Sequence, residues 1–475
     1  MKNMSLRILL LLLLMSSCYQ DMDDVPYTAS ELSIKNFIWR GMNKYYLYKP
    51  EVPELADDRF SGKEELNDYL AQFASPEDLF YEGLVAPGDQ FSFLVEDYRE
   101  LERLLDGINN INGMEYGLSR YSTGSDLVLG YVRYVLPGTS ADDQGLRRGD
   151  LFNTVDGQQL TVDNYYRLLQ PEVYTIGLAE FQGDQIVSTG EEINLEKQEY
   201  TEDPIYFSSV IPTSAGKVGY LMYNAFTGDF DPYLNDTFGN FKSEGITDLI
   251  LDLRYNGGGN VESATDLGSM ITGQFEGEIF HTEQWNPQMQ EYLQTIAPES
   301  LVNLFDDEIS NGTDINNLGL TRLYVLTTLS TASASELLIN SLSPYIQVIQ
   351  IGAPTTGKYQ ASTTLYDSPD FNRSGANPGH TYAIQPLIYK TVNAAGVTDY
   401  AEGLMPDIEI FENLRNLGTI GDINEPLLKT ALDHITGNPV QEDFRHLKAP
   451  DIIGESGSDE ILYQKMYAPN ELALQ

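Results

Sequence analysis

The chain has 475 residues, 41% hydrophobic and 21% charged, which is enough for about three globular domains and argues against wholesale disorder. Its formal net charge of −43 argues against binding to nucleic acid and against electrostatic adhesion to an anionic membrane surface. The single cysteine, Cys18, excludes an internal disulfide, a cysteine-rich zinc site and a cysteine nucleophile in the folded body. The four histidines are scattered without HExxH spacing, so no metal site is expected.

Residues 1–17 have the features of a secretory signal. A basic start precedes the apolar run Ile8–Met15, which is too short to span a bilayer. The small residues before Cys18 resemble the lipobox of bacterial lipoproteins, although a methionine stands where leucine is usual. That resemblance implies cleavage before Cys18 and acylation of the cysteine, which would anchor the chain to a membrane; an ordinary signal peptide is the alternative. The acidic residues 18–26 are interpreted as a tether.

Residues 27–110 have mainly helical spacing. Ser30 is a typical N-cap residue before apolar positions at helical spacing, and Lys63–Phe73 has a second such pattern. Ser75, which is followed by a proline, begins a further helix. We interpret this part as a small N-terminal helical domain without chemistry of its own.

Residues 111–200 are rich in strand signals. Leu127–Val135 and Leu151–Val155 are β-branched and aromatic runs, and the second is followed by the hairpin signal Asp156-Gly157. Val162–Leu169 predicts a helix.

The segment Leu136–Leu160 closely resembles part of a PDZ domain. Such a domain binds an extended peptide by adding it as a strand to the edge of its sheet. The resemblance implies that main-chain amides near the entrance of the groove hold a C-terminal carboxylate, and by analogy this loop lies near Tyr116, Gly117 and Leu118. The alternative is a PDZ-like scaffold that only braces the rest of the protein.

Residues 201–437 alternate between buried strands and amphipathic helices, which is typical of an α/β fold. Lys217–Leu221 and Leu249–Arg254 are predicted strands, with a helix over Asp231–Phe241 between them. The glycine-rich turn Tyr255–Asn260 then leads into another helix, and such a turn can aim backbone N–H groups at a ligand. The GxxxxGK[ST] pattern of a phosphate-binding loop is absent, and a plain tight turn is the alternative.

Ser333 and Lys358 form the pair that suggests chemistry. Ser333 follows the predicted strand Arg322–Leu326 where the chain passes into a helix, so its hydroxyl lies near free N–H groups and the positive end of the helix dipole. Lys358 ends the turn after a second strand, Ile346–Ile351. A lysine kept neutral by burial can take the proton of a serine. Each residue alone also fits a helix cap and a solvated lysine.

The string Ser333-Ala334-Ser335-Glu336, with Gly357-Lys358 downstream, resembles the C-terminal processing (tail-specific) serine peptidases. The glycine-rich turn and the PDZ-like segment precede it in the order expected for that family. The resemblance implies an α/β multidomain protein with a crotonase/ClpP-like protease core and a Ser–Lys dyad. It also implies an oxyanion hole made by an N–H of Gly258 or Gly259 with that of Ala334. No metal or organic cofactor is implied.

The sequence does not identify the residue that orients Lys358. Many members of the family carry a glutamine four positions after the lysine or an aspartate eleven positions after the serine. Ser362 and Pro344 stand at those positions here. Gln360 is a candidate replacement.

Two parts of the chain have no clear pattern. Gly273–Gly319 is polar and irregular and is either an elaboration near the substrate channel or a surface insert. The tail over residues 438–475 is weakly patterned and has no predicted function.

Together these features predict a lipid-anchored serine endopeptidase of the bacterial cell envelope, outside the cytoplasm. Its PDZ domain would capture extended or unfolded C-terminal segments of polypeptide substrates and deliver them to Ser333, where an acyl-enzyme forms. One alternative is a non-catalytic lipoprotein that binds peptides or hydrophobic ligands on the same fold. Another is an envelope scaffold that recruits a separate protease. The sequence does not indicate the substrate, the membrane leaflet or the oligomeric state.

Overall fold

The computed structural model describes residues 28–438, 450–458 and 460–468. The predicted signal peptide, the tether and Cys18 lie outside these residues. Within them, no helix combines the length and the apolar character needed to cross a bilayer.

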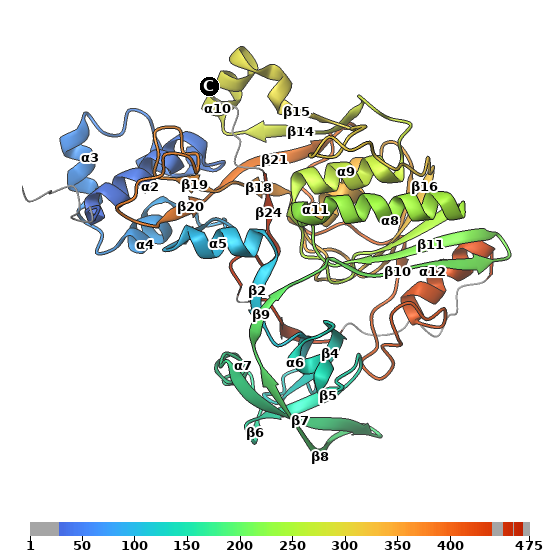
Figure 1. Ribbon diagram of the computed structural model, residues 1–475. Coiled ribbons are helices and arrows are strands. Elements are labelled where there is room, and N and C mark those ends of the chain that lie inside the picture. Colours follow the sequence, from blue (N-terminus) through green and yellow to red (C-terminus); the bar gives the residue numbers. More distant parts are fainter. Residues whose placement is uncertain (1–27, 439–449, 459, 469–475) are drawn as a thin grey trace, which may run out of the picture.

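A six-stranded sheet forms the centre of the molecule (Figure 1). Its strands run in the order β10-β11-β12-β16-β17-β22, and all neighbours are parallel except β10 and β11. The strands are β10 Ile205–Thr213, β11 Gly216–Tyr223, β12 Asp248–Asp252, β16 Arg322–Thr327, β17 Gln347–Gly352 and β22 Ile408–Glu409. The predicted strands of this region are therefore confirmed, with shifts at their ends.

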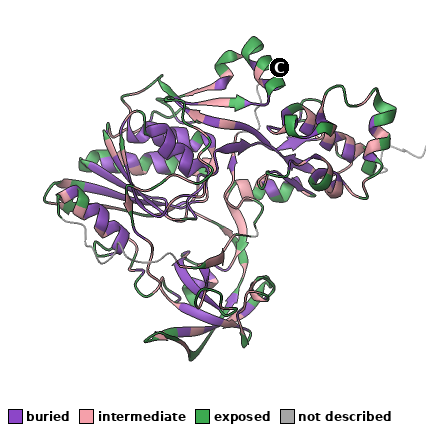
Figure 2. Cartoon of the chain, turned by 180° about the vertical axis from the view of Figure 1, so that it is seen from behind, coloured by how far each residue is buried: buried purple, intermediate pink, exposed green. Residues whose placement is uncertain are grey.

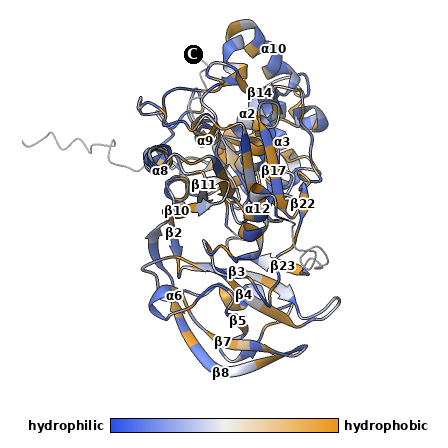
Figure 3. Ribbon diagram, turned by 90° about the vertical axis from the view of Figure 1, so that its right-hand side faces the viewer, coloured by the Kyte–Doolittle hydropathy of each residue, from blue (hydrophilic) through white to orange (hydrophobic). Residues whose placement is uncertain are grey.

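Helices cover both faces of the central sheet. One face packs on α8 Asp231–Glu244, α9 Val261–Ile271 and α11 Ala334–Leu342, and the other packs on α12 Pro426–Thr436. Alternate residues of β12 point to opposite faces, with Leu251 in the first core and Ile250 in the second. Parallel strands buried on both faces explain the nearly continuous apolar runs in the sequence. The hydropathy colouring shows these apolar positions between the helices (Figure 3).

A second six-stranded sheet lies beside the first and has the order β13-β24-β18-β21-β14-β15. Its strands are β13 Gly259–Asn260, β14 Ile279–Trp285, β15 Val302–Leu304, β18 Gln360–Ser362, β21 Leu387–Asn393 and β24 Met466–Tyr467. β14 pairs with β21 over five residue pairs, from His281–Asn393 to Trp285–Tyr389. Gly273–Gly319 is thus neither wholly irregular nor a mere surface insert, because it supplies two strands of this sheet and the helix α10 Pro287–Ile296.

The N-terminal region is helical, as predicted, but it is not self-contained. It comprises α2 Glu31–Tyr45, α3 Lys63–Leu70, α4 Pro76–Asp78, the π-helix η4 Leu79–Leu84 and α5 Tyr98–Leu105. The side chain of Ser30 caps α2 by accepting the N–H of Ser33 at 3.2 Å. Its strand β1 Phe93–Val95 pairs with β20 Ala383–Gln385, which pairs with β19 Leu365–Tyr366. Two strands from late in the chain therefore complete this region, and its core is continuous with that of the central sheet.

A separate β-rich unit lies at the bottom of Figure 1. It contains β3 Met114–Arg120, β4 Val128–Val135, β5 Leu151–Val155, β6 Gln158–Gln159, β7 Val173–Gln182 and β8 Gln185–Glu196, with the helices α6 Ser140–Asp143 and α7 Tyr165–Leu169. Two paired strands, β2 Ile108–Ile111 and β9 Gln198–Thr201, connect it to the rest of the chain. The outer strand β8 is largely exposed, in contrast to the buried central sheet (Figure 2).

Two predictions in this unit need correction. The helix α7 begins at Tyr165 rather than Val162, because Thr161 and Asn164 form a hydrogen-bonded turn before it. Tyr116, Gly117 and Leu118 lie inside strand β3 and not in a loop.

Candidate active site

Ser333 occupies a sharp turn between β16 and α11. It has φ of 66° and ψ of −113°, a backbone conformation that side-chain-bearing residues rarely adopt. Its side chain is fully buried, and its hydroxyl oxygen has no hydrogen-bond partner among the described residues. A strained turn from strand to helix with an unbonded hydroxyl is a known way to present a serine nucleophile.

Lys358 is also fully buried, and its Nζ has no hydrogen-bond partner in the described part of the chain. Burial lowers the pKa of Lys358 well below its usual range, the charge of Lys465 lowers it further, and Asp89 and Glu336 oppose the shift. The lysine is therefore favoured in its neutral form, in which it can accept a proton. Buried polar atoms without partners are rare in folded proteins and call for an explanation such as catalysis.

Glu336 connects the serine turn to the lysine turn. Its carboxylate accepts the N–H of Ser333 at 2.7 Å, of Gly357 at 2.7 Å and of Lys358 at 2.9 Å. It also accepts the hydroxyl of Thr355 at 2.5 Å. Burial raises the pKa of Glu336, and these four hydrogen bonds oppose the shift. The sequence identified Glu336 only as part of a motif; its position in the first turn of α11, three residues after the cap, was the available signal.

The glycine-rich turn lies directly against Ser333. Gly258 has φ of +111°, and a Cβ at this position would lie 2.6 Å from the Cβ of Ser333 and 3.0 Å from the N of Ala334. Only glycine fits such an approach. The two turns are also tied together, because Ala332 donates its N–H to the carbonyl of Asn256 at 3.1 Å.

The two residues predicted for the oxyanion hole are adjacent but not equivalent. The N–H of Ala334 has no acceptor among the described residues, so it is free to bind a developing oxyanion. The N–H of Gly258 instead donates to Oδ1 of Asn256 at 2.9 Å. The oxyanion role of this pair stays a prediction, and Asn256 is a residue of the site that the sequence did not single out.

The N-terminal region contributes to the lysine pocket. The ring of Phe91 lies 4.9 Å from Nζ of Lys358. Residues 27–110, interpreted from the sequence as a domain without chemistry of its own, therefore contact the predicted base. The candidate orienting residue Gln360 donates through Nε2 to the hydroxyl of Tyr48 at 3.0 Å, and its Oε1 is buried without a partner among the described residues. The hydroxyl of Ser362 donates to the carbonyl of Met466 at 3.0 Å and so does not serve the lysine.

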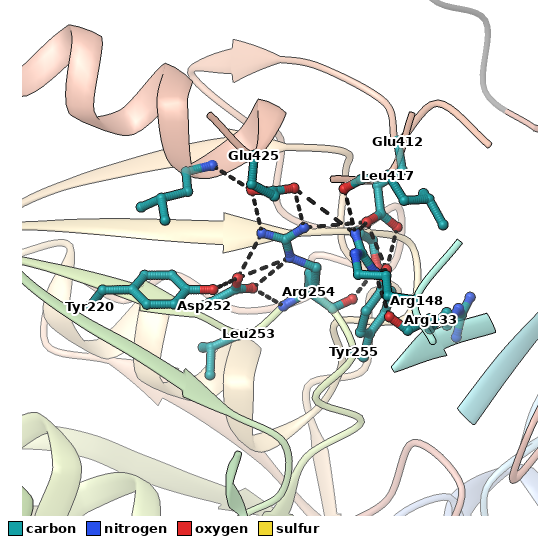
Figure 4. Close-up of polar contacts among 12 residues, drawn as sticks. Arg133, Arg148, Tyr220, Asp252, Leu253, Arg254, Tyr255, Glu412, Leu417 and Glu425 are labelled. Atoms are coloured by element: carbon teal, nitrogen blue, oxygen red, sulfur yellow. Dashed lines mark hydrogen bonds and ion pairs between the residues drawn. The ribbon is translucent and has the colours of Figure 1, made fainter. Parts of the chain in front are cut away.

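A buried charge network lies under the glycine-rich turn (Figure 4). Arg254 is fully buried and pairs with Asp252 and Glu425, each at 2.7 Å. Glu412 forms ion pairs with Arg254 at 3.3 Å and with Arg148 of the β-rich unit at 2.5 Å. Burial raises the pKa of Glu412, but the two guanidinium groups outweigh it and hold the pKa at about 2. The network therefore links the β-rich unit to the base of the site.

None of the described residues form a group of three or more His, Cys, Asp and Glu side chains arranged to hold a metal ion. His281, the histidine within β14, is fully buried, and burial lowers its pKa to about 3. It is therefore a neutral core residue.

Comparison with known proteins identifies the family. The sequence pattern of Peptidase family S41 matches residues 217–410, and that of the Peptidase S41 N-terminal domain matches residues 33–93. The chain belongs to peptidase family S41. The matched S41 ranges contain the glycine-rich turn, the serine turn and the lysine turn in one part and Phe91 in the other.

Relatives and solved structures agree with this S41 assignment. A C-terminal processing peptidase of the chloroplast of Tetradesmus obliquus is 25% identical over 61% of this chain and 57% of its own length. This S41 chain thus spans a little over half the length of that curated relative. A Bacteroides fragilis protein assigned to the S41 proteases superimposes with a TM-score of 0.65 at 25% identity, over 84% of this chain and 97% of its own. The photosystem II D1 C-terminal processing protease shares the fold, with a TM-score of 0.50 at 20% identity over 86% of this chain and 99% of its own.

The predicted peptide-binding residues of this S41 chain are already paired in the structure. Strand β23 Ile452–Glu455, from the C-terminal tail, runs antiparallel along β3, with Gly454 opposite Leu118 and Glu455 opposite Gly117. The next residue, Ser456, donates its N–H to the carbonyl of Tyr116 at 2.9 Å. The tail was unpatterned in the sequence because each of its strands has four residues or fewer.

Proposed function

We propose that this S41 chain is a serine endopeptidase with Ser333 as nucleophile and Lys358 as general base. The observation that carries the proposal is the pair of buried, unbonded atoms, Ser333 Oγ and Lys358 Nζ, whose backbones are fixed by the same carboxylate. Neutral Lys358 takes the hydroxyl proton, and Oγ attacks the substrate carbonyl carbon. The protonated lysine then passes its proton to the leaving amine, and water hydrolyses the resulting ester.

The oxyanion of the tetrahedral intermediate would be stabilised by the N–H of Ala334. In other serine proteases one such donor contributes about 2.7–4 kcal/mol to the transition state. The Gly258 N–H joins it if substrate binding releases that group from Asn256, to which it is now bonded at 2.9 Å. Hydrogen bonds of this kind often form only in the complex with substrate.

Three finer features belong to the same proposal. Residues 111–200 would act as a PDZ domain that delivers extended polypeptides to the site, supported by strand β3, along which the segment β23 is added, and by the helix α7. Cys18 would carry the lipid anchor that holds the enzyme at a membrane, outside the cytoplasm, which is supported by the sequence pattern before it. The lysine base gives an activity that rises with pH and is insensitive to chelators.

Hydrolysis of an unstructured protein such as β-casein tests the proposal. Ser333→Ala and Lys358→Ala should each reduce the rate by at least about 10³-fold. Ser341→Ala is the matched control, because Ser341 is also a buried, unbonded serine of α11, and it should leave the rate unchanged. Equal rates in all four proteins would show that the dyad is not the catalyst. Stable peptide binding without hydrolysis by the unsubstituted chain would instead favour a binding protein on the same fold.

A further inference from the structure

The C-terminal tail crosses the molecule from the β-rich unit to the catalytic turns. Strand β23 is added to the edge of the sheet of the β-rich unit, next to β3. Eleven residues after β23 ends, the chain forms β24, which is inserted between β13 and β18 of the second sheet. In Figure 1 this segment is the red trace that rises from the lower unit to the label β24.

In the β-rich unit the tail is bound as a peptide ligand would be. It pairs with β3 and so forms the edge of the sheet, and Ile453 packs against the apolar core of the unit. Tyr165 of α7 donates its hydroxyl to the carbonyl of Ile453 at 3.2 Å. Strand addition together with a side-chain pocket is the general mode by which such grooves recognise extended peptides.

A buried ion pair fixes the register of the tail. Glu455, the last residue of β23, pairs with Arg133 of β4, and both side chains are buried. Ser330, in the loop that leads to Ser333, donates its hydroxyl to the same carboxylate at 2.6 Å. Glu455 therefore lies where the groove meets the catalytic loop.

Beyond this junction the tail passes the nucleophile. The position that a Cβ on Gly258 would take lies 2.9 Å from the carbonyl oxygen of Lys465, 2.6 Å from the Cβ of Ser333 and 3.0 Å from the N of Ala334. The main chain of Lys465 thus borders the nucleophile and the free oxyanion donor. Its side chain lies over the same Phe91 ring that contacts Lys358.

We propose that residues 452–458 and 460–467 occupy the peptide path of this enzyme in cis and indicate which peptides the path binds. The ligand is an internal extended segment with a branched aliphatic residue at the place of Ile453 and a carboxylate two residues later for Arg133. A free C-terminal carboxylate is not needed in the groove, since the occupant continues past it for more than ten residues. A substrate has to displace the tail. The identification of this path as the substrate path rests on the proposed function.

The contacts of β23 suit a segment that can be displaced. Three of its four residues are only partly buried. The ion pair that holds it gains little net stability, because burying two charges offsets most of their attraction. Release of such a segment requires far less free energy than global unfolding does.

The test measures peptide binding in a Ser333→Ala background, where no hydrolysis interferes. A fluorescent synthetic peptide with the sequence of residues 450–468 is titrated with the full chain, and anisotropy gives the Kd. Glu455→Lys in the protein places two positive charges together, so the tail should leave the groove and the Kd should fall by at least about tenfold. Glu299→Lys changes the net charge equally at an exposed position and should not alter the Kd.

A charge exchange makes the test specific. A peptide carrying Glu455→Lys should not bind the Glu455→Lys protein but should bind an Arg133→Glu protein. If Glu455→Lys does not fold, Ile453→Asn weakens the apolar contact, keeps the ion pair and should also lower the Kd. The proposal is wrong if folded variants bind the peptide no better than the parent, since the tail is then a fixed strand. Better binding with no hydrolysis by the Ser333 protein would overturn the proposed function and leave the displaceable tail standing.

Discussion

The catalytic turns and the junction with the β-rich unit are held by different interactions. At the turns, backbone N–H groups from the serine and lysine segments converge on the single carboxylate of Glu336. At the junction, ion pairs between side chains join separate parts of the chain: Arg148 with Glu412, and Arg133 with Glu455. The first arrangement fixes two backbones and leaves their reactive atoms unbonded. The second connects a peptide groove to the core.

The two kinds of interaction differ in how firmly they fix the chain. Hydrogen bonds between a buried carboxylate and backbone donors are short and directional, so they set the position of Ser333 and Lys358 closely. Ion pairs depend on protonation, and they can be exchanged for pairs with another chain. The junction is therefore the place at which a substrate can replace the tail without disturbing the catalytic turns.

Removal of Glu336 should have the largest effect and should be confined to the turns. Glu336→Ala leaves three backbone N–H groups and the Thr355 hydroxyl without their acceptor. At about 1–3 kcal/mol for each unsatisfied buried group, the loss of stability should exceed about 3 kcal/mol. The kcat should fall by about 10³-fold, because both catalytic residues lose their frame.

Chemical denaturation and casein hydrolysis measure these two effects, with Glu299→Ala as an exposed control. Anisotropy with the labelled peptide provides the comparison between the two regions. Glu336→Ala should leave peptide affinity unchanged within about twofold, since the groove does not contact this carboxylate. A parallel loss of peptide binding would show that the two regions are not independent.

Local sequence signals account for the parts of the site that were predictable. The cap at Ser30, the turn before α11 and the turn at Gly258 each follow from residues within a few positions of one another. The alternation of strands and helices in residues 201–437 follows from periodicity. These features are short-range, and the sequence carries them directly.

Long-range contacts account for what was missed. Phe91 reaches Lys358 because the N-terminal region shares a sheet with β19 and β20, and no local pattern indicates that pairing. The tail strands β23 and β24 have four and two residues, too short for any periodicity to appear. They form strands because β23 pairs at the edge of one sheet and β24 pairs between two strands of another. Tyr116, Gly117 and Leu118 lie in strand β3, beside β23, and their role in peptide binding stays a prediction.

Substitution of Glu412 tests the charged junction. The pKa of Glu412 is lowered from 4.5 to about 2 by Arg148 and Arg254. A carboxylate with a depressed pKa stabilises the folded state above its unfolded pKa, and this contribution is lost as the pH falls through the folded pKa. The shift corresponds to about 3 kcal/mol. Glu412→Gln should therefore lose about 3 kcal/mol at pH 7, and its difference from the unsubstituted chain should shrink between pH 4.5 and pH 2.

Calorimetry at pH 7, 4 and 3 gives these differences, with the exposed Glu402→Gln as control. A constant difference at all three values would mean that Glu412 contributes through packing alone. The catalytic turns should respond little, so the rate of hydrolysis of a short peptide at pH 7 should change less than stability does.

Gly258→Ala alters the glycine-rich turn and should lower activity by about 10²-fold. The added Cβ would lie 2.6 Å from the Cβ of Ser333, well inside contact distance. Ser333 or the glycine turn must then move by several tenths of an ångström, and displacements of this size cost catalysis heavily. Gly245→Ala adds the same methyl group at a left-handed glycine with open space around it, so it controls for backbone strain. Equal rates for the two variants would contradict the close approach of the two turns.

The smallest effect on stability is expected from Lys358→Met, and its sign is the informative part. The pKa of Lys358 is lower in the folded state than its ordinary value of 10.5, because the site is buried. Between the two pKa values the unfolded chain binds more protons, so stability rises with pH and the lysine is a burden at pH 7. Lys358→Met removes that burden and should stabilise the protein by about 0.5–2 kcal/mol at pH 7.

The gain should shrink as the pH approaches 10, where the unfolded lysine also loses its proton. Thermal unfolding from pH 6 to pH 10 measures it, with Lys390→Met as a control, since Lys390 is partly exposed and paired with Asp399 at 2.7 Å. A lower Tm for Lys358→Met at pH 7 would mean that the buried lysine is a stabilising cation and not a base held neutral for catalysis. A higher Tm together with lost hydrolysis would show that the buried lysine lowers the stability of the folded chain and is required for catalysis. Its backbone is held by Glu336 in both cases.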